Sequence, residues 1–269
     1  MPRRLSFAWL DLEAPARVVL ERTPLSLALC QLRFPSVLSI ESQSWIAPFQ
    51  EAIREDYPLV SSVQNIQVPL GIGSGGKPPL PSESRAWRFA DLPENWTVTL
   101  TTDSISIETR SYLHFTDFLD RLGEVLEAVA THIHPAVATR IGLRYINEIR
   151  PEHSDWVSVI RPELLGPVAV PQFAACKLQS IQQFVVRASD GVGITISHGV
   201  VPEGTAVDPR SGQEAPKTPF YLLDFDVYQE FGAVKNVMPI SSDIIRDRVD
   251  SFHDAVSKLF RWSVTPEYL

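Results

Sequence analysis

The segment Ala138-Thr139-Arg140-Ile141-Gly142-Leu143-Arg144-Tyr145-Ile146-Asn147-Glu148-Ile149-Arg150 contains the clearest structural pattern in this chain. Apolar and charged side chains alternate along it. The apolar set is Ile141, Leu143, Tyr145 and Ile149, and the charged set is Arg140, Arg144, Glu148 and Arg150. A repeat of two residues predicts a β-strand. Because one face is apolar, we expect this strand to lie inside a sheet with that face on the hydrophobic core.

Further strands are predicted on both sides of this segment. The runs that predict them are 25–34, 86–89, 96–101, 104–109, 181–187, 193–198 and 220–228. Helical spacing of apolar residues predicts helices at 45–54, at 112–130 and in a C-terminal segment beginning at Ser242 or Asp243. The regular strand–helix alternation of a doubly wound parallel fold is absent. We therefore expect an α+β fold, with antiparallel sheets covered by long amphipathic helices.

Three parts can be distinguished along the chain. They are an N-terminal arm at 1–22, an N-terminal α+β half at 23–150 and a C-terminal α+β half at 151–269. Each half contains strands, a hairpin and a long helix, so two related β-β-α halves are one interpretation. A single continuous domain is the other, and a length of 269 residues allows both.

Composition narrows the class of protein. Apolar residues make up 44% and charged residues 21%, as in ordinary globular domains, and the net charge of -8 opposes general affinity for nucleic acid or anionic membranes. Apolar runs fall short of the ~20 residues that span a bilayer, and Asp11 and Glu13 interrupt the one near the N-terminus. Cys30 and Cys176 are predicted to be buried free thiols. We expect a cytoplasmic protein that binds neither nucleic acid nor membrane.

One glycine-rich segment imitates a nucleotide-binding motif. Gly71-Ile72-Gly73-Ser74-Gly75-Gly76-Lys77 satisfies G-x-x-x-x-G-K, but Pro78 stands where a magnesium-binding serine or threonine should follow. Pro78, Pro79 and Pro81 also prevent the helix whose N-terminal amides would bind phosphate. The segment is predicted to be a flexible connection and not a phosphate-binding loop.

Two arginines form the first candidate site. Arg140 and Arg144 share the charged face of the 138–150 strand, where two forked guanidinium groups could hold a small anion or a carboxylate. The interpretation that we favour is an ion-pair network with Glu148 and Arg150.

Two aspartates form the second candidate site. Asp224 and Asp226 are predicted to point to one face of their strand, and His198 ends another strand. Two carboxylates and a histidine could bind a divalent cation or act as acid and base, although a solvated strand face is the simpler interpretation. The histidines lack zinc-type spacing and no G-x-S-x-G elbow occurs, so we assign no metal and no cofactor.

Several short segments together resemble a known family. They are Gln31–Phe34, Phe49-Gln50 with Tyr57-Pro58, Tyr112, Gly142–Asn147 and Leu223–Asp226. Through them the chain, from about Thr23 to the C-terminal helix, resembles a sporadically distributed family of uncharacterised bacterial proteins marked by a G-L-R-Y-I-N strand. The resemblance implies an accessory, horizontally transferred gene, a context that includes phage defence. The motif carries no catalytic assignment.

These observations lead to three functional hypotheses. The first is a non-enzymatic, cytoplasmic bacterial protein that binds another protein, or a second copy of itself as a homo-oligomer, within a multi-gene system. The second is a metal-dependent hydrolase that uses Asp224, Asp226 and His198. The third is a sensor that binds a small anion at Arg140 and Arg144.

Overall fold

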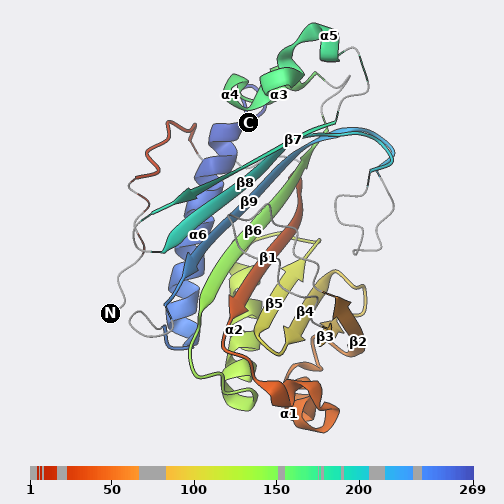
Figure 1. The fold of residues 1–269 in the computed structure, drawn as a ribbon, viewed down its shortest axis with the longest axis vertical. Helices are drawn as coiled ribbons and strands as arrows, with labels where there is room; N and C mark the ends of the chain where they lie inside the picture. Colours follow the sequence, from red (N-terminus) through yellow and green to blue (C-terminus); the bar gives the residue numbers. More distant parts are fainter. Residues whose placement is uncertain are drawn as a thin grey trace. The chain divides into compact units, whose positions relative to one another are not determined.

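A computed structural model describes residues 5, 7, 9–16, 23–66, 83–150, 155–174, 176, 179–188, 191–205, 216–232 and 238–269. Within these residues the strands form one nine-stranded sheet with the order β2-β3-β4-β5-β1-β6-β9-β8-β7 (Figure 1). The strands are β1 Leu25–Arg33, β2 Leu59–Ile66, β3 Glu83–Ala90, β4 Trp96–Thr101, β5 Ser104–Thr109, β6 Arg140–Ile149, β7 Ser180–Arg187, β8 Val192–Val201 and β9 Phe220–Glu230. The segment 71–77 lies outside the described residues.

The helices are fewer and mostly short. They are α1 Gln43–Ile53, α2 Phe115–His132, α3 Trp156–Val159, α4 Pro162–Leu165, α5 Pro171–Ala174 and α6 Ser242–Ser263, with 3₁₀ turns η1 Leu38–Glu41 and η3 Gly166–Ala169. No helix in the described parts of the chain is long and apolar enough to cross a bilayer.

The expected fold class is wrong in its main feature. We expected α+β sheets covered by long helices, with two β-β-α halves as one interpretation, but a single antiparallel sheet dominates the structure. The 138–150 segment forms β6, which lies between β1 and β9 in the strand order. Periodicity predicts which face of a strand is buried but not which strands are its neighbours. The order of the strands in the sheet could therefore not be predicted from periodicity.

The chain forms two compact units, whose boundaries fall inside β1, β6 and α6 and at the end of β9. Unit 1 comprises Met1–Ala28, Gly142–Glu230 and Asp247–Leu269, and unit 2 comprises Leu29–Ile141 and Phe231–Arg246.

Unit 2 has its core between strands β3–β5 and helices α1 and α2. Phe49 of α1 meets Phe89 of β3 edge-on, with ring centroids 5.5 Å apart. Phe118 of α2 packs on Trp96 of β4 at 5.8 Å. The Nε1 of Trp87 donates to the carbonyl oxygen of Ile40 at 2.7 Å, which ties η1 to β3. The apolar stripe of α2 and the alternation of β4 and β5 thus produce the helix and hairpin that the sequence predicts.

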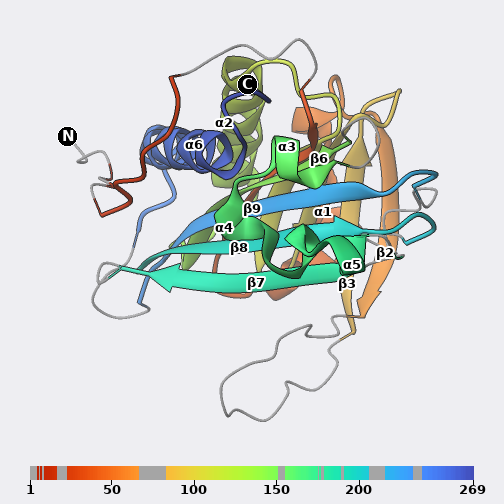
Figure 2. The same ribbon diagram turned by 90° about the horizontal axis from the view of Figure 1, so that it is seen from above.

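Unit 1 has α6 across one face of β9, β8 and β7 (Figure 2). Val249, Phe252, Val256 and Leu259 form its buried seam. Tyr145 of β6 points to this helix, with its hydroxyl 3.0 Å from Nδ1 of His253. Apolar spacing of four and three residues along α6 explains this packing.

The N-terminal arm, in its described part, lies against α6. The Nζ of Lys258 donates to the carbonyl oxygen of Leu10 at 3.0 Å, and the Nε of Arg261 donates to that of Pro15 at 2.9 Å. Phe7 also meets the ring of Phe252 edge-on. The arm is therefore part of the helix packing of unit 1.

The two cysteines differ in environment. Cys30 is buried in β1, as predicted, but Cys176 is exposed, so the prediction of two buried thiols is half wrong. Cys176 lies in the segment of short helices before β7, where its apolar neighbours Val170 and Phe173 are themselves exposed.

Candidate functional site

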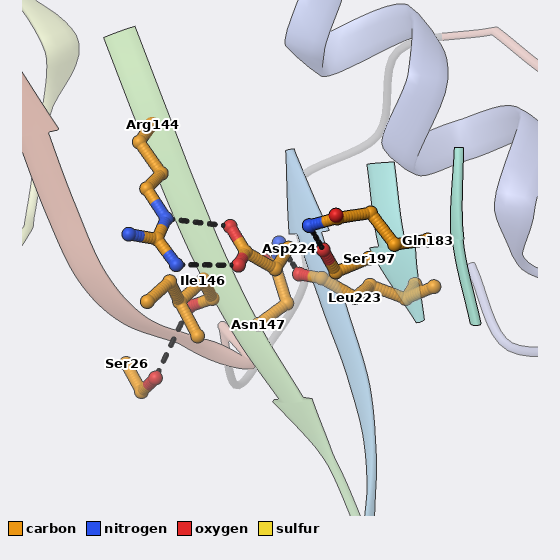
Figure 3. A network of polar contacts seen from close by, with 8 residues as sticks. All are labelled: Ser26, Arg144, Ile146, Asn147, Gln183, Ser197, Leu223 and Asp224. Carbon is orange, nitrogen blue, oxygen red and sulfur yellow. Dashed lines mark hydrogen bonds and ion pairs between the residues drawn. The ribbon is translucent and has the colours of Figure 1, made fainter. Parts of the chain in front are cut away.

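Arg144 and Asp224, one residue from each of the two predicted sites, form an ion pair with each other. The Nε of Arg144 on β6 donates to Oδ1 of Asp224 on β9 at 2.8 Å, and Nη2 donates to Oδ2 at 2.7 Å (Figure 3). The pairing is bidentate, the strong form of an arginine–carboxylate contact. The Asp224 side chain is 10% exposed and the Arg144 side chain 44% exposed.

Strand alternation places this pair on the sheet face opposite α6. Tyr145 contacts His253 of α6, so its neighbour Arg144 points the other way. We call this side of unit 1 the Arg144 face. Across it the register sets Asp224 beside Ser197 of β8 and Ser197 beside Gln183 of β7.

Polar side chains continue the row from the ion pair toward the edge of the sheet. The Nε2 of Gln183 donates to Oγ of Ser197 at 2.9 Å (Figure 3). On the other side of the ion pair, the Oγ of Ser26 donates to the carbonyl oxygen of Ile146 at 3.1 Å. Asn147, whose side chain points to the α6 side, donates from Nδ2 to the carbonyl oxygen of Leu223 at 3.1 Å. These bonds tie neighbouring strands together.

The remaining charged residues of β6 are also in contact with other groups. Arg150 pairs with Glu148 at 2.6 Å and lies over the ring of Phe220, 4.8 Å from its centroid. This pair belongs to the ion-pair network that we favoured. The partner of Arg144, however, is an aspartate 80 residues away that the sequence assigned to another site. Arg140 is the first residue of β6 and belongs to unit 2, whereas Arg144 belongs to unit 1.

The structure separates His198 from the two aspartates. In the β8–β9 register Ser197 is opposite Asp224 and Thr195 opposite Asp226, whereas His198 is opposite Leu223. His198 therefore points to the α6 side of the sheet, and the aspartates point to the Arg144 face. Within the residues that the structure describes, no group of three His, Cys, Asp or Glu side chains could hold a metal ion.

His198 belongs to a buried hydrogen-bond relay. Its Nδ1 lies 3.0 Å from the hydroxyl of Tyr221, and that hydroxyl donates to the carbonyl oxygen of Leu164 at 2.8 Å. Because tyrosine has a single hydroxyl proton, Nδ1 of His198 must be the donor to Tyr221. Burial lowers the pKa of His198 and raises the pKa of Tyr221, so both side chains are neutral at pH 7.

This relay predicts a loss of stability in acid. The folded state holds His198 with a pKa below the unfolded value of about 6.5, so the unfolded state binds a proton more readily. Well above pH 6.5, His198 is neutral in both the folded and the unfolded state, so it has no effect on stability. The free energy of unfolding should then fall as pH drops from about 6.5 toward the lowered pKa. His198→Asn should reduce this slope, measured by urea unfolding between pH 7.5 and 5. An unchanged slope in the variant would contradict the assignment.

One feature was missed by the sequence reasoning: among the described residues, β7 is an edge strand of the sheet and pairs only with β8 (Figure 2). Four of its apolar side chains are exposed, namely Ile181 at 47%, Phe184 at 39%, Val185 at 47% and Val186 at 37%. We call the outer side of Ser180–Arg187 the β7 edge. A possible signal was the pattern Ile-Gln-Gln-Phe-Val-Val, which lacks the strict alternation of a strand with one buried face.

Comparison with known proteins gives no relative. No protein-family model matches the chain, and neither the curated proteins nor the solved structures yield a significant match.

Proposed function

We propose that this chain is a non-enzymatic, cytoplasmic protein-binding component of a multi-gene bacterial system, and that the β7 edge is its binding surface. The observation that carries the proposal is an edge strand with large apolar side chains exposed on both of its faces. Phage defence is the kind of system that the resemblance of the sequence implies.

Within the described residues no strand pairs with the outer side of β7, and such an open edge supports binding because it is a liability in a protein that acts alone. Natural edge strands are shielded by proline, lysine, inward-pointing charge or a covering element. Between Ser180 and Val186 the chain has neither proline nor a charged residue. The exposed Phe173 of α5 and Val170 add to the apolar surface of the segment that precedes β7. Exposed apolar side chains of this kind mark interaction sites.

Three of the candidate site residues, Arg144, Asp224 and His198, have partners within unit 1. Arg144 holds Asp224, Arg150 holds Glu148, and His198 is bonded to Tyr221 on the other side of the sheet. Such pairs stabilise a sheet. Their arrangement supports a binding protein better than a hydrolase built on Asp224, Asp226 and His198 or an anion sensor at Arg140 and Arg144.

A single charged substitution on the edge tests the proposal. Val185→Lys should leave the fold intact, because the side chain is half exposed, and should weaken capture of the native partner at least about tenfold, because binding would bury the ammonium group. The measurement is affinity purification from the native host with quantitative mass spectrometry.

The matched control is Leu92→Lys in unit 2, where the leucine is 74% exposed. A protein captured by the wild type and by Leu92→Lys but lost with Val185→Lys supports the proposal. Equal capture by all three forms would refute the assignment of the β7 edge.

A further inference from the structure

We infer that the β7 edge receives an extended, largely apolar segment of a partner protein as a tenth strand, antiparallel to β7, with an acidic side chain opposite Arg187. This inference rests on the proposed function and names the chemistry of the partner. Strand addition of this kind combines backbone hydrogen bonds with side-chain selectivity.

The backbone of β7 has N–H and C=O groups that point away from β8 and can pair with such a strand. The amide of Ala188 donates to the carbonyl oxygen of Val192 at 2.8 Å, which identifies this pair as one that is hydrogen-bonded across β7 and β8. Bonded and non-bonded pairs alternate along an antiparallel ladder. The even-numbered residues of β7 therefore bond to β8. The N–H and C=O groups that point outward belong to Ile181, Gln183, Val185 and Arg187.

β7 exposes apolar side chains on both of its faces, so both faces of the incoming strand should be apolar as well. Ile181 and Val185 are on the Arg144 face with Gln183, because Gln183 bonds to Ser197 there. Phe184 and Val186 are on the α6 side, where Phe184 meets the ring of His198. The partner segment should accordingly carry β-branched or aromatic residues at successive positions.

Arg187 determines where along the edge an acidic residue of the segment should lie. Arg187 is the one charged residue of β7 and lies at its C-terminal end. Within the described residues its Nε bonds to the hydroxyl of Tyr228 at 3.5 Å, and Glu230 attracts it only at longer range. Tyr228 takes this position because Gly193 leaves room for its ring. Antiparallel pairing is the more stable kind per residue, and an antiparallel partner has its N-terminal end opposite Arg187, so its acidic residue should lie near that end.

The size of the edge favours an extended segment over a second copy of this chain. Eight residues span roughly 26 Å of a sheet about 10 Å thick, so two rigid sheets meeting edge to edge would bury on the order of 500 Å². Stable interfaces between folded proteins bury about 1,200 Å² or more. That threshold applies to interfaces between folded proteins, whereas an added strand draws its affinity from main-chain hydrogen bonds along the edge.

Two synthetic peptides of identical composition test the direction. Each has about ten residues, alternates valine and threonine, and carries one aspartate near the N-terminus or near the C-terminus, with an uncharged solubilising tail. By fluorescence anisotropy, the peptide with the N-terminal aspartate should bind about 3–5-fold more tightly, the value of one cross-strand charge pair. Arg187→Glu should abolish this preference, and it should transfer the preference to the peptide in which lysine replaces the N-terminal aspartate.

Backbone methylation tests whether the peptide forms a strand. N-methyl groups on alternate residues block one edge of a β-strand. Methylation of the edge that faces β7 should abolish binding, and methylation of the opposite edge should leave it unchanged.

The outcomes separate this inference from the proposed function. Equal binding of the two peptides, no binding at millimolar concentration, or insensitivity to N-methylation would overturn the inference. A dimer detected by light scattering and dispersed by Val185→Lys would assign a second copy as the occupant and would also overturn it. In each of these cases the proposed function would still be supported if Val185→Lys loses the captured partner.

Discussion

Replacing Gly199 with alanine should destabilise unit 1 by about 3 kcal/mol or more, the largest effect that we expect from a single methyl group in this chain. Gly199 lies in β8 with φ of +142°, a conformation that residues with a Cβ rarely adopt. A Cβ there would also clash with the carbonyl oxygen of Ser180, the first residue of β7. The backbone must move, so the N-terminal end of β7 should separate from β8.

A matched glycine separates the clash from the backbone strain. Gly204 has φ of +80°, and a Cβ added to it would meet nothing within 4 Å. Gly204→Ala should therefore cost only about 1 kcal/mol. Urea unfolding of the two variants gives the comparison, and equal losses would contradict the close approach of β7 at Gly199.

Arg144→Ala should destabilise unit 1 by about 2–4 kcal/mol, because it leaves the carboxylate of Asp224 nearly buried and without its bidentate partner. Asp224→Ala should cost less, about 1 kcal/mol, since the half-exposed guanidinium of Arg144 can turn to water. The double variant should recover part of the loss, with a coupling energy of at least about 1 kcal/mol.

An exposed ion pair provides the control for this cycle. Glu51 of α1 pairs at 2.8 Å with Arg54, the residue that follows the helix, but both side chains are more than half exposed. Arg54→Ala should cost less than about 1 kcal/mol. Strictly additive losses for Arg144→Ala and Asp224→Ala would show that the pair at the centre of the Arg144 face contributes no stability.

Individual strands could be predicted from the sequence because they depend on local chemistry. The alternation of Arg140 to Ile149 gives β6, and Thr102-Asp103 gives the turn between β4 and β5. Strand order could not be predicted in this way, because it depends on contacts between residues far apart in the chain. The pairing of Arg144 with Asp224 is an example, since each was recognised as a candidate but the adjacency of β6 and β9 was not visible.

Register explains why His198 was grouped with the wrong residues. It pairs with Leu223, and a shift of one residue would have placed it on the face of Asp224. Side chains alternate with a period of two, so such a shift reverses every side chain of a strand. Nothing in the local sequence of β8 or β9 determines that register. The same argument applies to β7, whose apolar residues predict a strand but not its place at the edge.

Amide hydrogen exchange along β7, with and without the bound partner, tests the central claim most directly. In the free protein, the amides of Gln182, Phe184 and Val186 should be protected by bonds to β8, and those of Gln183 and Val185 should exchange quickly. The partner to add is the protein that the wild type captures and Val185→Lys does not. At saturation it should slow the exchange of the amides of Gln183 and Val185. Continued fast exchange of both amides in the complex would contradict binding at the β7 edge.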